Sequence, residues 1–203
     1  MYIYGAGGHA KVIMEILEVL AIPVDGLFVD GPEKAQVWEH VATAFPGSFH
    51  SGRDQLILAI GSNAARKKLV SRLHVLYGTA VHPAANISPR AVMGEGTVVM
   101  AGATVNADVQ IGRHSIINTN ASVDHDCTLG DYVHISPNAT LCGGVSVGEG
   151  AHIGAGAVVI PDIKIGNWAV IGAGAVVVKD VPDGVTAAGN PARVLVKKLS
   201  GDD

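Results

Sequence analysis

The chain has 203 residues, a formal net charge of −4, 48% hydrophobic residues and only 4% aromatic residues. This small charge, with no long run of either sign, argues against nucleic acid or an anionic membrane as the partner and favours a small molecule. No apolar segment approaches the roughly 18 to 20 residues that span a bilayer, and the first residues lack the basic start of a signal peptide, so we expect a cytoplasmic protein.

The opening residues, MYIYGAGGHAKVIMEILEVL, predict a strand, a glycine-rich turn and a helix. Within the helix, Ile13, Ile16, Leu17 and Leu20 follow the i, i+3, i+4, i+7 spacing of a buried face. Further apolar runs follow, and the last precedes a second helical pattern, SNAARKKLVSRL. Strands that alternate with helices predict a small parallel sheet, and we expect a Rossmann-like domain over residues 1–78.

The turn from Gly5 to Ala10 matches a variant of the dinucleotide-binding fingerprint, and Asp30 follows at the expected distance. Glycines let the backbone approach phosphates at a helix N-terminus, and an acid can take the ribose hydroxyls. A plain connecting turn is the alternative interpretation. Because the segment is too short for a complete dinucleotide domain, a mononucleotide or a nucleotide sugar suits it better than NAD.

Every sixth residue from Ile87 to Val177 is apolar, and glycine or another small residue recurs beside these positions. Hexapeptide repeats are typical of parallel β-helices, in which three hexads close one triangular coil. Residues eighteen apart then stack at about 4.8 Å. We expect such a β-helix over residues 79–203, with no long loop interrupting the hexads from Ile87 to Val177.

The eighteen-residue step predicts which side chains stack on neighbouring coils. It places Gly143 and Gly144 beside His125 and Asp126, so that a slender ligand could lie along bare backbone there. It also predicts that His134 stacks with His152 and that His114 lies below Tyr132.

His125 and Asp126 are the candidate catalytic residues, because an amine or hydroxyl that attacks a thioester must lose a proton and an imidazole accepts it well. A carboxylate fixes the tautomer and favours the imidazolium, but neighbouring side chains on a strand point apart, so contact requires a bend at the corner. A solvent-facing histidine is the plain alternative. The Gly143 amide is the candidate oxyanion donor.

The remaining unusual residues have plainer interpretations. We expect Cys127 and Cys142 to be free buried thiols rather than a disulfide, with Cys127 in a small-residue position where it would be inert. Trp38 and Trp168 are expected to be packing residues, with Trp168 pointing outwards towards a neighbouring segment or a ligand.

Nearly the whole chain resembles the bacterial nucleotide-sugar and sialic acid O- or N-acetyltransferases of the left-handed β-helix, hexapeptide-repeat class. The resemblance rests on IYGAGGHAKV, LAIGSNAARKKL, the hexads from NTNASVDHDCTLGDYVH onwards, and AAGNPARVL. It is closest to enzymes that acetylate the 4-amino group of UDP-4-amino-4,6-dideoxy sugars, the bacillosamine type. It implies acetyl-CoA as co-substrate, no metal, and a homotrimer with active sites between adjacent β-helices.

The resemblance also implies roles for individual residues. His125 would be the general base and Asp126 the acid that raises its basicity, although many relatives carry Glu at that position. Acetyl-CoA would be bound by His134, Gly143, Ala155, Gly172, Ala173, Pro191 and Arg193. The nucleotide sugar would be bound by Gly7, Gly8, His9, Asp30, Ile60, Gly61 and Asn118.

Three other functions stay open at this point. A sialic acid O-acetyltransferase shares much of the pattern, and a non-catalytic nucleotide-sugar-binding scaffold would share the N-terminal domain. A zinc enzyme like the γ-type carbonic anhydrases could recruit His114, His125, His134 and His152, but it would need neither the N-terminal domain nor the terminal GNPAR. The sequence leaves open the sugar, the nucleotide base, N- against O-acetylation, and which subunit supplies each site residue.

Overall fold

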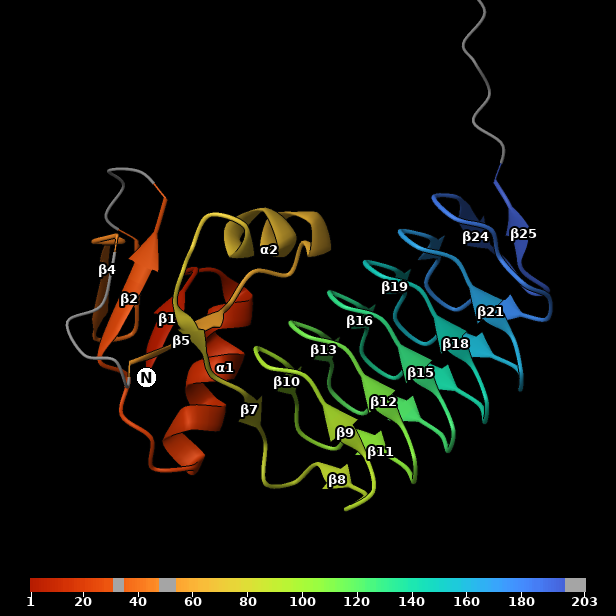
Figure 1. Ribbon diagram of the computed structural model, residues 1–203, viewed down its shortest axis with the longest axis horizontal. Helices are drawn as coiled ribbons and strands as arrows, with labels where there is room; N and C mark the ends of the chain where they lie inside the picture. Colours follow the sequence, from red (N-terminus) through yellow and green to blue (C-terminus); the bar gives the residue numbers. More distant parts are fainter. Residues whose placement is uncertain (31–34, 48–53, 196–203) are drawn as a thin grey trace, which may run out of the picture.

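The computed structural model describes residues 1–30, 35–47 and 54–195. A small α/β unit at the N-terminus is followed by a long β-helix, whose coils succeed one another to the C-terminal end (Figure 1). In the described residues, no helix is both long and apolar enough to cross a membrane. The predicted fold class, a Rossmann-like unit joined to a hexapeptide β-helix, is therefore confirmed.

In its described residues, the N-terminal unit is a six-stranded sheet of order β3-β4-β2-β1-β5-β6 with two helices. Its strands are β1 (Tyr2–Tyr4), β2 (Gly26–Val29), β3 (Gln36–Val37), β4 (His40–Ala44), β5 (Gln55–Leu58) and β6 (Leu76–Tyr77), and its helices are α1 (Gly8–Val19) and α2 (Asn63–Val70). Each pair of these described strands is parallel except the edge hairpin β3–β4, which was not predicted. Trp38, which was expected to be a packing residue, lies in the turn of this hairpin with φ 52° and is 44% exposed.

Helix α1 joins the sheet to the β-helix. Ile13, Ile16 and Leu17 are fully buried, as the helical spacing predicted, and they belong to one apolar core that also includes Val98 of the β-helix. Leu20 was predicted to share this face, but it lies at the C-cap, where the helix ends, and is 38% exposed.

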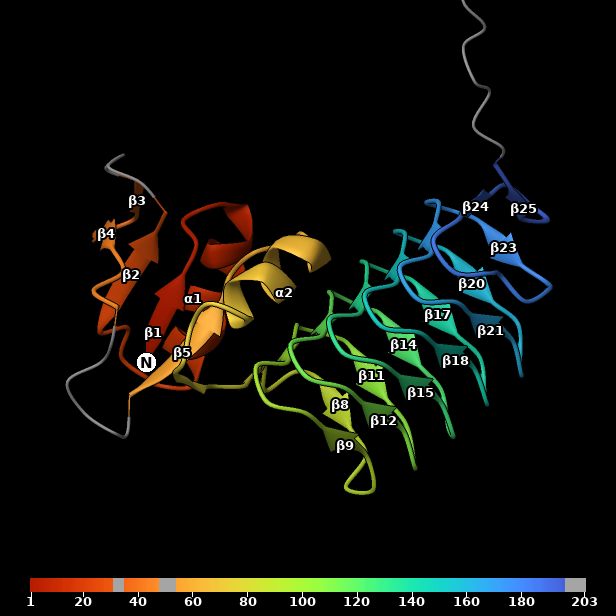
Figure 2. The ribbon, with the colours of Figure 1, turned by 45° about the horizontal axis from the view of Figure 1, so that its top comes forward.

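The β-helix has three faces, each a ladder of very short strands (Figure 2). The first face contains β7 (Ala80–Val81), β10 (Val98–Val99), β13 (Ile116–Ile117), β16 (His134–Ile135), β19 (His152–Ile153), β22 (Val170–Ile171), β24 (Thr186–Ala188) and the antiparallel β25 (Arg193–Val194). The second face contains β8 (Asn86–Ile87), β11 (Thr104–Val105), β14 (Ser122–Val123), β17 (Thr140–Leu141), β20 (Val158–Val159) and β23 (Val176–Val177). The third face contains β9 (Val92–Met93), β12 (Gln110–Ile111), β15 (Thr128–Leu129), β18 (Ser146–Val147) and β21 (Lys164–Ile165).

Residues eighteen apart pair across neighbouring coils, as Ile117 pairs with Ile135, so the predicted register is confirmed. From Val99 to Val177 the repeated apolar residue is buried at every coil and fills the centre of the helix. Ile87 and Met93 are only partly buried because they lie in the first coil, where no complete coil covers them from below.

Helix α2 docks on the first face through one side of the helix. Asn63 donates hydrogen bonds to the carbonyl oxygens of Gly150 and Ala151, at 3.0 and 3.1 Å. Lys67 pairs with Glu149 and lies 5.3 Å from the ring centroid of Trp168, which identifies the segment that this tryptophan meets.

Arg66 lies at the centre of this contact and is 1% exposed. Its guanidinium donates to the carbonyl oxygens of His114 and Tyr132, each at 3.0 Å, and to Ile60, Gly61 and Asn63 within its own unit. Burial lowers its pKa to about 10. This one side chain therefore bonds two coils of the β-helix to the unit that carries the glycine-rich turn.

Candidate active site

His125 and Asp126 lie at the corner between the second and third faces, in the turn from β14 to β15. Nδ1 of His125 is 2.8 Å from Oδ2 of Asp126. The contact forms because Asp126 has φ 60°, a left-handed conformation that Asp tolerates and that turns the chain back between the two residues. The bend that the sequence required is therefore present.

The electrostatic surroundings of this imidazole suit a base. Its pKa is raised above the ordinary value, first by the hydrogen bond to Asp126 and then by the charge of Asp124. Asp124 itself accepts hydrogen bonds from Asn106 Nδ2 at 2.7 Å and from the His125 amide at 2.8 Å. Because Nδ1 faces Asp126, Nε2 remains as the atom that can accept a proton from a substrate.

Gly143 lies directly beyond this ring on the next coil, as predicted. A Cβ atom at Gly143 would lie 2.6 Å from Cε1 of His125 and 2.9 Å from its Nε2, so only glycine leaves room for the imidazole. The ring therefore rests against bare backbone, with Gly144 next along the chain.

His134 lies on the first face, away from the corner that carries His125. Its ring stacks with His152 at 4.8 Å between centroids, which confirms the predicted histidine ladder, and Asn118 Nδ2 donates to its Nε2 at 3.1 Å. Burial, with the nearby His152 and Arg66, lowers the pKa of His134 to about 3, so the ring is neutral at pH 7. The structure thus brings Asn118 and His134 together at the contact between the two units.

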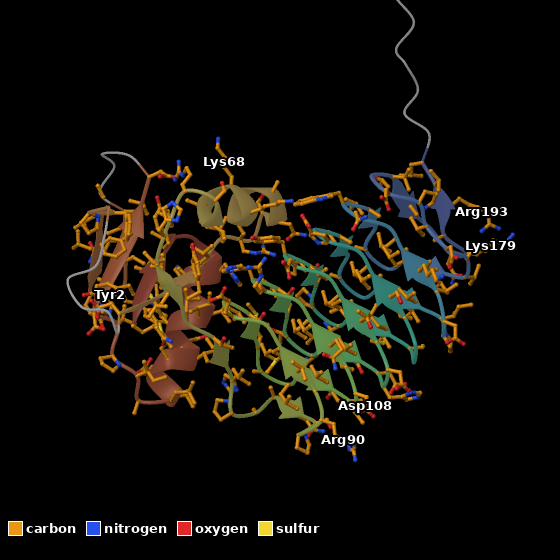
Figure 3. All side chains as sticks on the ribbon, in the orientation of Figure 1. Tyr2, Lys68, Arg90, Asp108, Lys179 and Arg193 are labelled. Carbon is orange, nitrogen blue, oxygen red and sulfur yellow. The ribbon has the colours of Figure 1, made fainter. Side chains whose placement is uncertain are left out.

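The other residues expected to bind acetyl-CoA occupy different places. Ala155 and Ala173 are exposed at the corner between the first and second faces, one coil apart, and Gly172 precedes Ala173. Arg193 lies at the C-terminal end with Lys179, as Figure 3 shows, and both line a cavity of 230 Å³. Pro191 lies in the turn just before β25.

A second cavity, of 310 Å³, opens at the carboxyl ends of β1 and β2 and contains two of the predicted nucleotide-binding residues, Asp30 and Ile60. Asp30 accepts hydrogen bonds from Tyr4 Oη at 2.6 Å and from Arg72 at 3.1 Å, and the bond from Tyr4 is the largest cause of its lowered pKa. Sequence reasoning missed Tyr4 and Arg72. The place of Tyr4 at the end of a parallel strand was the available signal, because ligands bind at that edge of such sheets.

The first residue of the glycine-rich turn, Gly5, must be glycine because of its backbone conformation and its close neighbours. Gly5 has φ 118°, and a Cβ there would lie 2.6 Å from the Ala59 carbonyl oxygen. Gly7 and Gly8 are exposed at the start of α1 and stand outside the residues that line the cavity. His9 is turned towards the contact between the units, where burial and Arg66 lower its pKa to about 4.

Gly61 contributes through its backbone, since its carbonyl oxygen accepts a hydrogen bond from Arg66 Nη1 at 3.1 Å. Among the predicted nucleotide-binding residues, Gly61, His9 and Asn118 therefore lie near the contact between the units rather than in the 310 Å³ cavity.

The cysteines are free thiols. Cys127 is fully buried and donates to the Cys142 carbonyl oxygen at 3.2 Å, and burial raises its pKa to about 11, which makes it a poor nucleophile. Cys142 is only partly buried, so the expectation of two buried thiols was wrong for this residue, which lies at the open corner beside Gly143.

The four histidines that a zinc site could recruit do not gather in one place, because only His134 and His152 lie against each other. His114 is enclosed between Tyr77 and Tyr132, and the predicted stacking with Tyr132 is confirmed at 5.4 Å and 10°. Over the described ranges, no three His, Cys, Asp or Glu side chains are grouped as a metal ion would require.

Two family models match the chain. Residues 1–73 match the PglD N-terminal domain, and residues 90–125, 108–143 and 144–179 match the bacterial transferase hexapeptide repeat. Perosamine N-acetyltransferase from Caulobacter crescentus, solved as a histidine-to-asparagine mutant with CoA and GDP-perosamine, is 41% identical with a TM-score of 0.90, over 97% of this chain and 96% of that one. The chain belongs to this family of sugar N-acetyltransferases.

Other members of the family agree with this assignment. The acetyltransferase domain of PglB from Neisseria gonorrhoeae, in complex with acetyl coenzyme A, is 37% identical with a TM-score of 0.88, over 96% of this chain and 98% of that one. The UDP-N-acetylbacillosamine N-acetyltransferase of Bacillus subtilis is 45% identical over 111 residues, 46% of this chain and 48% of that protein. That alignment spans about half the length of the curated relative.

Proposed function

We propose that the protein transfers the acetyl group of acetyl-CoA to the 4-amine of a nucleotide-activated 4-amino-4,6-dideoxy sugar. The observation that carries this proposal is the hydrogen-bonded pair of His125 and Asp126, whose imidazole rests on the bare backbone of Gly143. The sugar nitrogen attacks the thioester carbonyl, Nε2 of His125 takes the proton that the nitrogen loses, and the departing sulfur receives a proton as the C–S bond breaks.

The gain in rate comes largely from holding the amine and the thioester together. Asp126 stabilises the imidazolium that forms, and the Gly143 amide is the candidate donor to the oxyanion. Cys127 takes no part, because its buried thiol has a raised pKa.

The nucleotide is proposed to bind in the 310 Å³ cavity, with Asp30 and Arg72 at its polar end and Ile60 against the base or ribose. Gly7 and Gly8 would offer backbone amides to the phosphates at the start of α1. His9, Gly61 and Asn118 would support this side of the site from the contact between the units.

Assembly as a homotrimer is part of the proposal. His125 occupies the corner opposite the first face, whereas His134 and the N-terminal unit lie on the first face and Ala155 lies at another corner. One chain therefore separates residues that the reaction needs in one place, and an adjacent copy can bring its own corner to them. The residues proposed for acetyl-CoA, including His134, Gly172, Ala173, Pro191 and Arg193, would then be shared between copies. Because acetyl-CoA and nucleotide sugars are intracellular metabolites, we place the reaction in the cytoplasm.

The deciding experiment measures thiol release from acetyl-CoA with UDP-, GDP- and dTDP-4-amino sugars and with free sialic acid. We expect turnover of one nucleotide amino sugar, loss of that turnover in His125→Ala, and full turnover in the exposed control His74→Ala. Turnover with sialic acid alone would reassign the protein to the O-acetyltransferases. Binding of nucleotide sugar without turnover in wild type would make it a scaffold, and sedimentation of a monomer would contradict the shared site.

A further inference from the structure

The side chains of His125 and Asp162 approach the same stretch of backbone from opposite directions. His125 leans forward by one coil and lies against Gly143, where an added Cβ would meet its ring at 2.6 Å. Asp162 leans back by one coil, so that its Oδ1 atom covers the position where a Cβ of Gly144 would stand. The imidazole and this carboxylate therefore face each other across the Gly143–Gly144 peptide.

Such bare backbone occurs in only one of four successive coils at the corner between the second and third faces. Asp108, Asp126, Gly144 and Asp162 occupy the same left-handed position in four successive coils, with φ of 61°, 60°, 71° and 62°. Only Gly144 lacks a side chain, and the Asp162 carboxylate lies over its backbone, so His125 and Asp162 flank the Gly143–Gly144 backbone from the two neighbouring coils. Both of these side chains are exposed, so a ligand can reach them from solvent.

The carboxylates at this corner differ in what they already bind. Asp124 accepts from Asn106, Asp126 faces His125, and Asp108 lies 3.7 Å from Arg90. Within the described residues, the Asp162 carboxylate makes no hydrogen bond or ion pair. Its acceptor capacity is therefore free for a ligand that reaches this exposed corner.

We propose that Asp162 binds the acceptor amine in its ammonium form and thereby positions the nitrogen beside the imidazole of His125. This inference rests on the proposed function and adds a positioning residue that selects amines over hydroxyls. An aliphatic amine is largely protonated near neutral pH, and an ammonium group donates charge-assisted hydrogen bonds to a carboxylate that a neutral hydroxyl cannot match. An anionic acceptor such as sialic acid would be repelled by the carboxylates at this corner.

The protons of the bound ammonium group can all be accounted for in the acetyl transfer. The bound ammonium releases one proton to the solvent at this exposed corner, which leaves a neutral amine. Its lone pair forms the new C–N bond, its second proton passes to Nε2 of His125, and the sulfur takes that proton from the imidazolium as the C–S bond breaks. Asp162 is not consumed and does not need to change its protonation state.

The test compares Asp162→Asn with Asp108→Asn, a matched control at the same corner position three coils earlier. In the wild-type background we measure KM for the nucleotide amino sugar, KM for acetyl-CoA, and kcat. Loss of a charge-assisted hydrogen bond should raise the amino-sugar KM of Asp162→Asn by about 10- to 100-fold. The KM for acetyl-CoA should stay within about two-fold, Asp108→Asn should match wild type, and Asp162→Glu should recover part of the loss.

The preference for an amine over a hydroxyl is a second measurement, and it should not change if Asp162 has only a structural role. The ratio of turnover on the 4-amino sugar to turnover on its 4-hydroxyl analogue should fall in Asp162→Asn and stay unchanged in Asp108→Asn. An unchanged amino-sugar KM, or an equal loss for acetyl-CoA, would overturn the inference.

Failure of the proposed function would look different, because wild type itself would then turn over none of the amino sugars. In that case calorimetry with the nucleotide amino sugar decides the role of Asp162. Weaker binding by Asp162→Asn than by wild type supports the inference, and equal binding by the two rejects it.

Discussion

Nδ1 of His125 and Oδ2 of Asp126 lie 2.8 Å apart although the two residues are adjacent in the chain. On an extended strand their side chains would point to opposite sides, and the left-handed backbone of Asp126 removes that separation. The corner of a coil can therefore form a hydrogen-bonded acid–base pair from two consecutive residues.

Asp126→Asn should keep the backbone, since Asn also tolerates the left-handed conformation, but remove the charge that supports the imidazolium. Because Asp126 raises the pKa of His125, the acid limb of the kcat/KM profile should move to lower pH and the plateau should fall by about 100-fold. A pH–rate profile checks both. A profile identical to wild type would show that the pair has no role in proton transfer.

Gly143→Ala should displace the imidazole, because the new methyl group would stand 2.6 Å from Cε1 of His125. We expect a loss of kcat of about 100-fold with little change in the melting temperature, since the exposed ring can move aside. The double variant with His125→Ala is the control. Without the ring the alanine has nothing to displace, so the two losses should not add, and additive losses would place the effect of Gly143 elsewhere.

Arg66→Met should weaken the contact between the N-terminal unit and the β-helix. The carbonyl oxygens of His114 and Tyr132 would lose their buried donor. Leaving such groups unsatisfied costs about 1–3 kcal/mol each, and we expect a clear fall in the unfolding free energy measured with urea. Lys67→Met is the neighbouring control, since its pair with Glu149 is exposed to solvent and should contribute far less than the buried bonds of Arg66. Equal effects of the two substitutions would contradict the role assigned to Arg66.

Acid should destabilise the fold through its buried imidazoles. His9 and His114 have pKa values lowered to about 4, and His134 to about 3, each first by burial. Between about pH 6.5 and these values the unfolded chain binds protons that the folded chain does not, so stability is complete above pH 6.5 and falls as the pH drops towards 4. Each such group contributes a slope of about 1.4 kcal/mol per pH unit.

His114→Asn isolates one of these groups, because Asn can adopt the left-handed φ of 54° at that corner. Urea unfolding at several pH values should show a shallower slope below pH 6.5 than in wild type, by about one proton. A wild-type slope in His114→Asn would mean that this ring is already protonated in the folded state.

The register of the β-helix could be predicted from sequence because the hexad repeat has one dominant cause, the burial of a single apolar side chain per strand. The stacking of His134 with His152 and of His114 with Tyr132 followed from that register alone. Gly143 beside His125 followed in the same way.

Features that depend on side-chain direction or on contacts between the units could not be predicted. Arg66 stands among three consecutive cations in the sequence, and nothing local distinguishes the buried one from its exposed neighbours Lys67 and Lys68. Likewise, the exposure of Trp38 depends on an edge hairpin with no strong alternating pattern. The lean of Asp162 towards Gly144 depends on the left-handed corner, which the hexad spacing does not encode.

The unbroken coil register also fixes the distances along the axis of the β-helix. His125 and Lys179 occupy equivalent corner positions separated by 54 residues, or three coils of eighteen, which corresponds to about 14 Å along the axis. Deleting one whole coil between them would preserve every face but shorten the distance between the two positions by about 5 Å. Deleting a single hexad would instead rotate everything beyond it onto the next face, so this distance can change only in whole coils if the faces are to be kept.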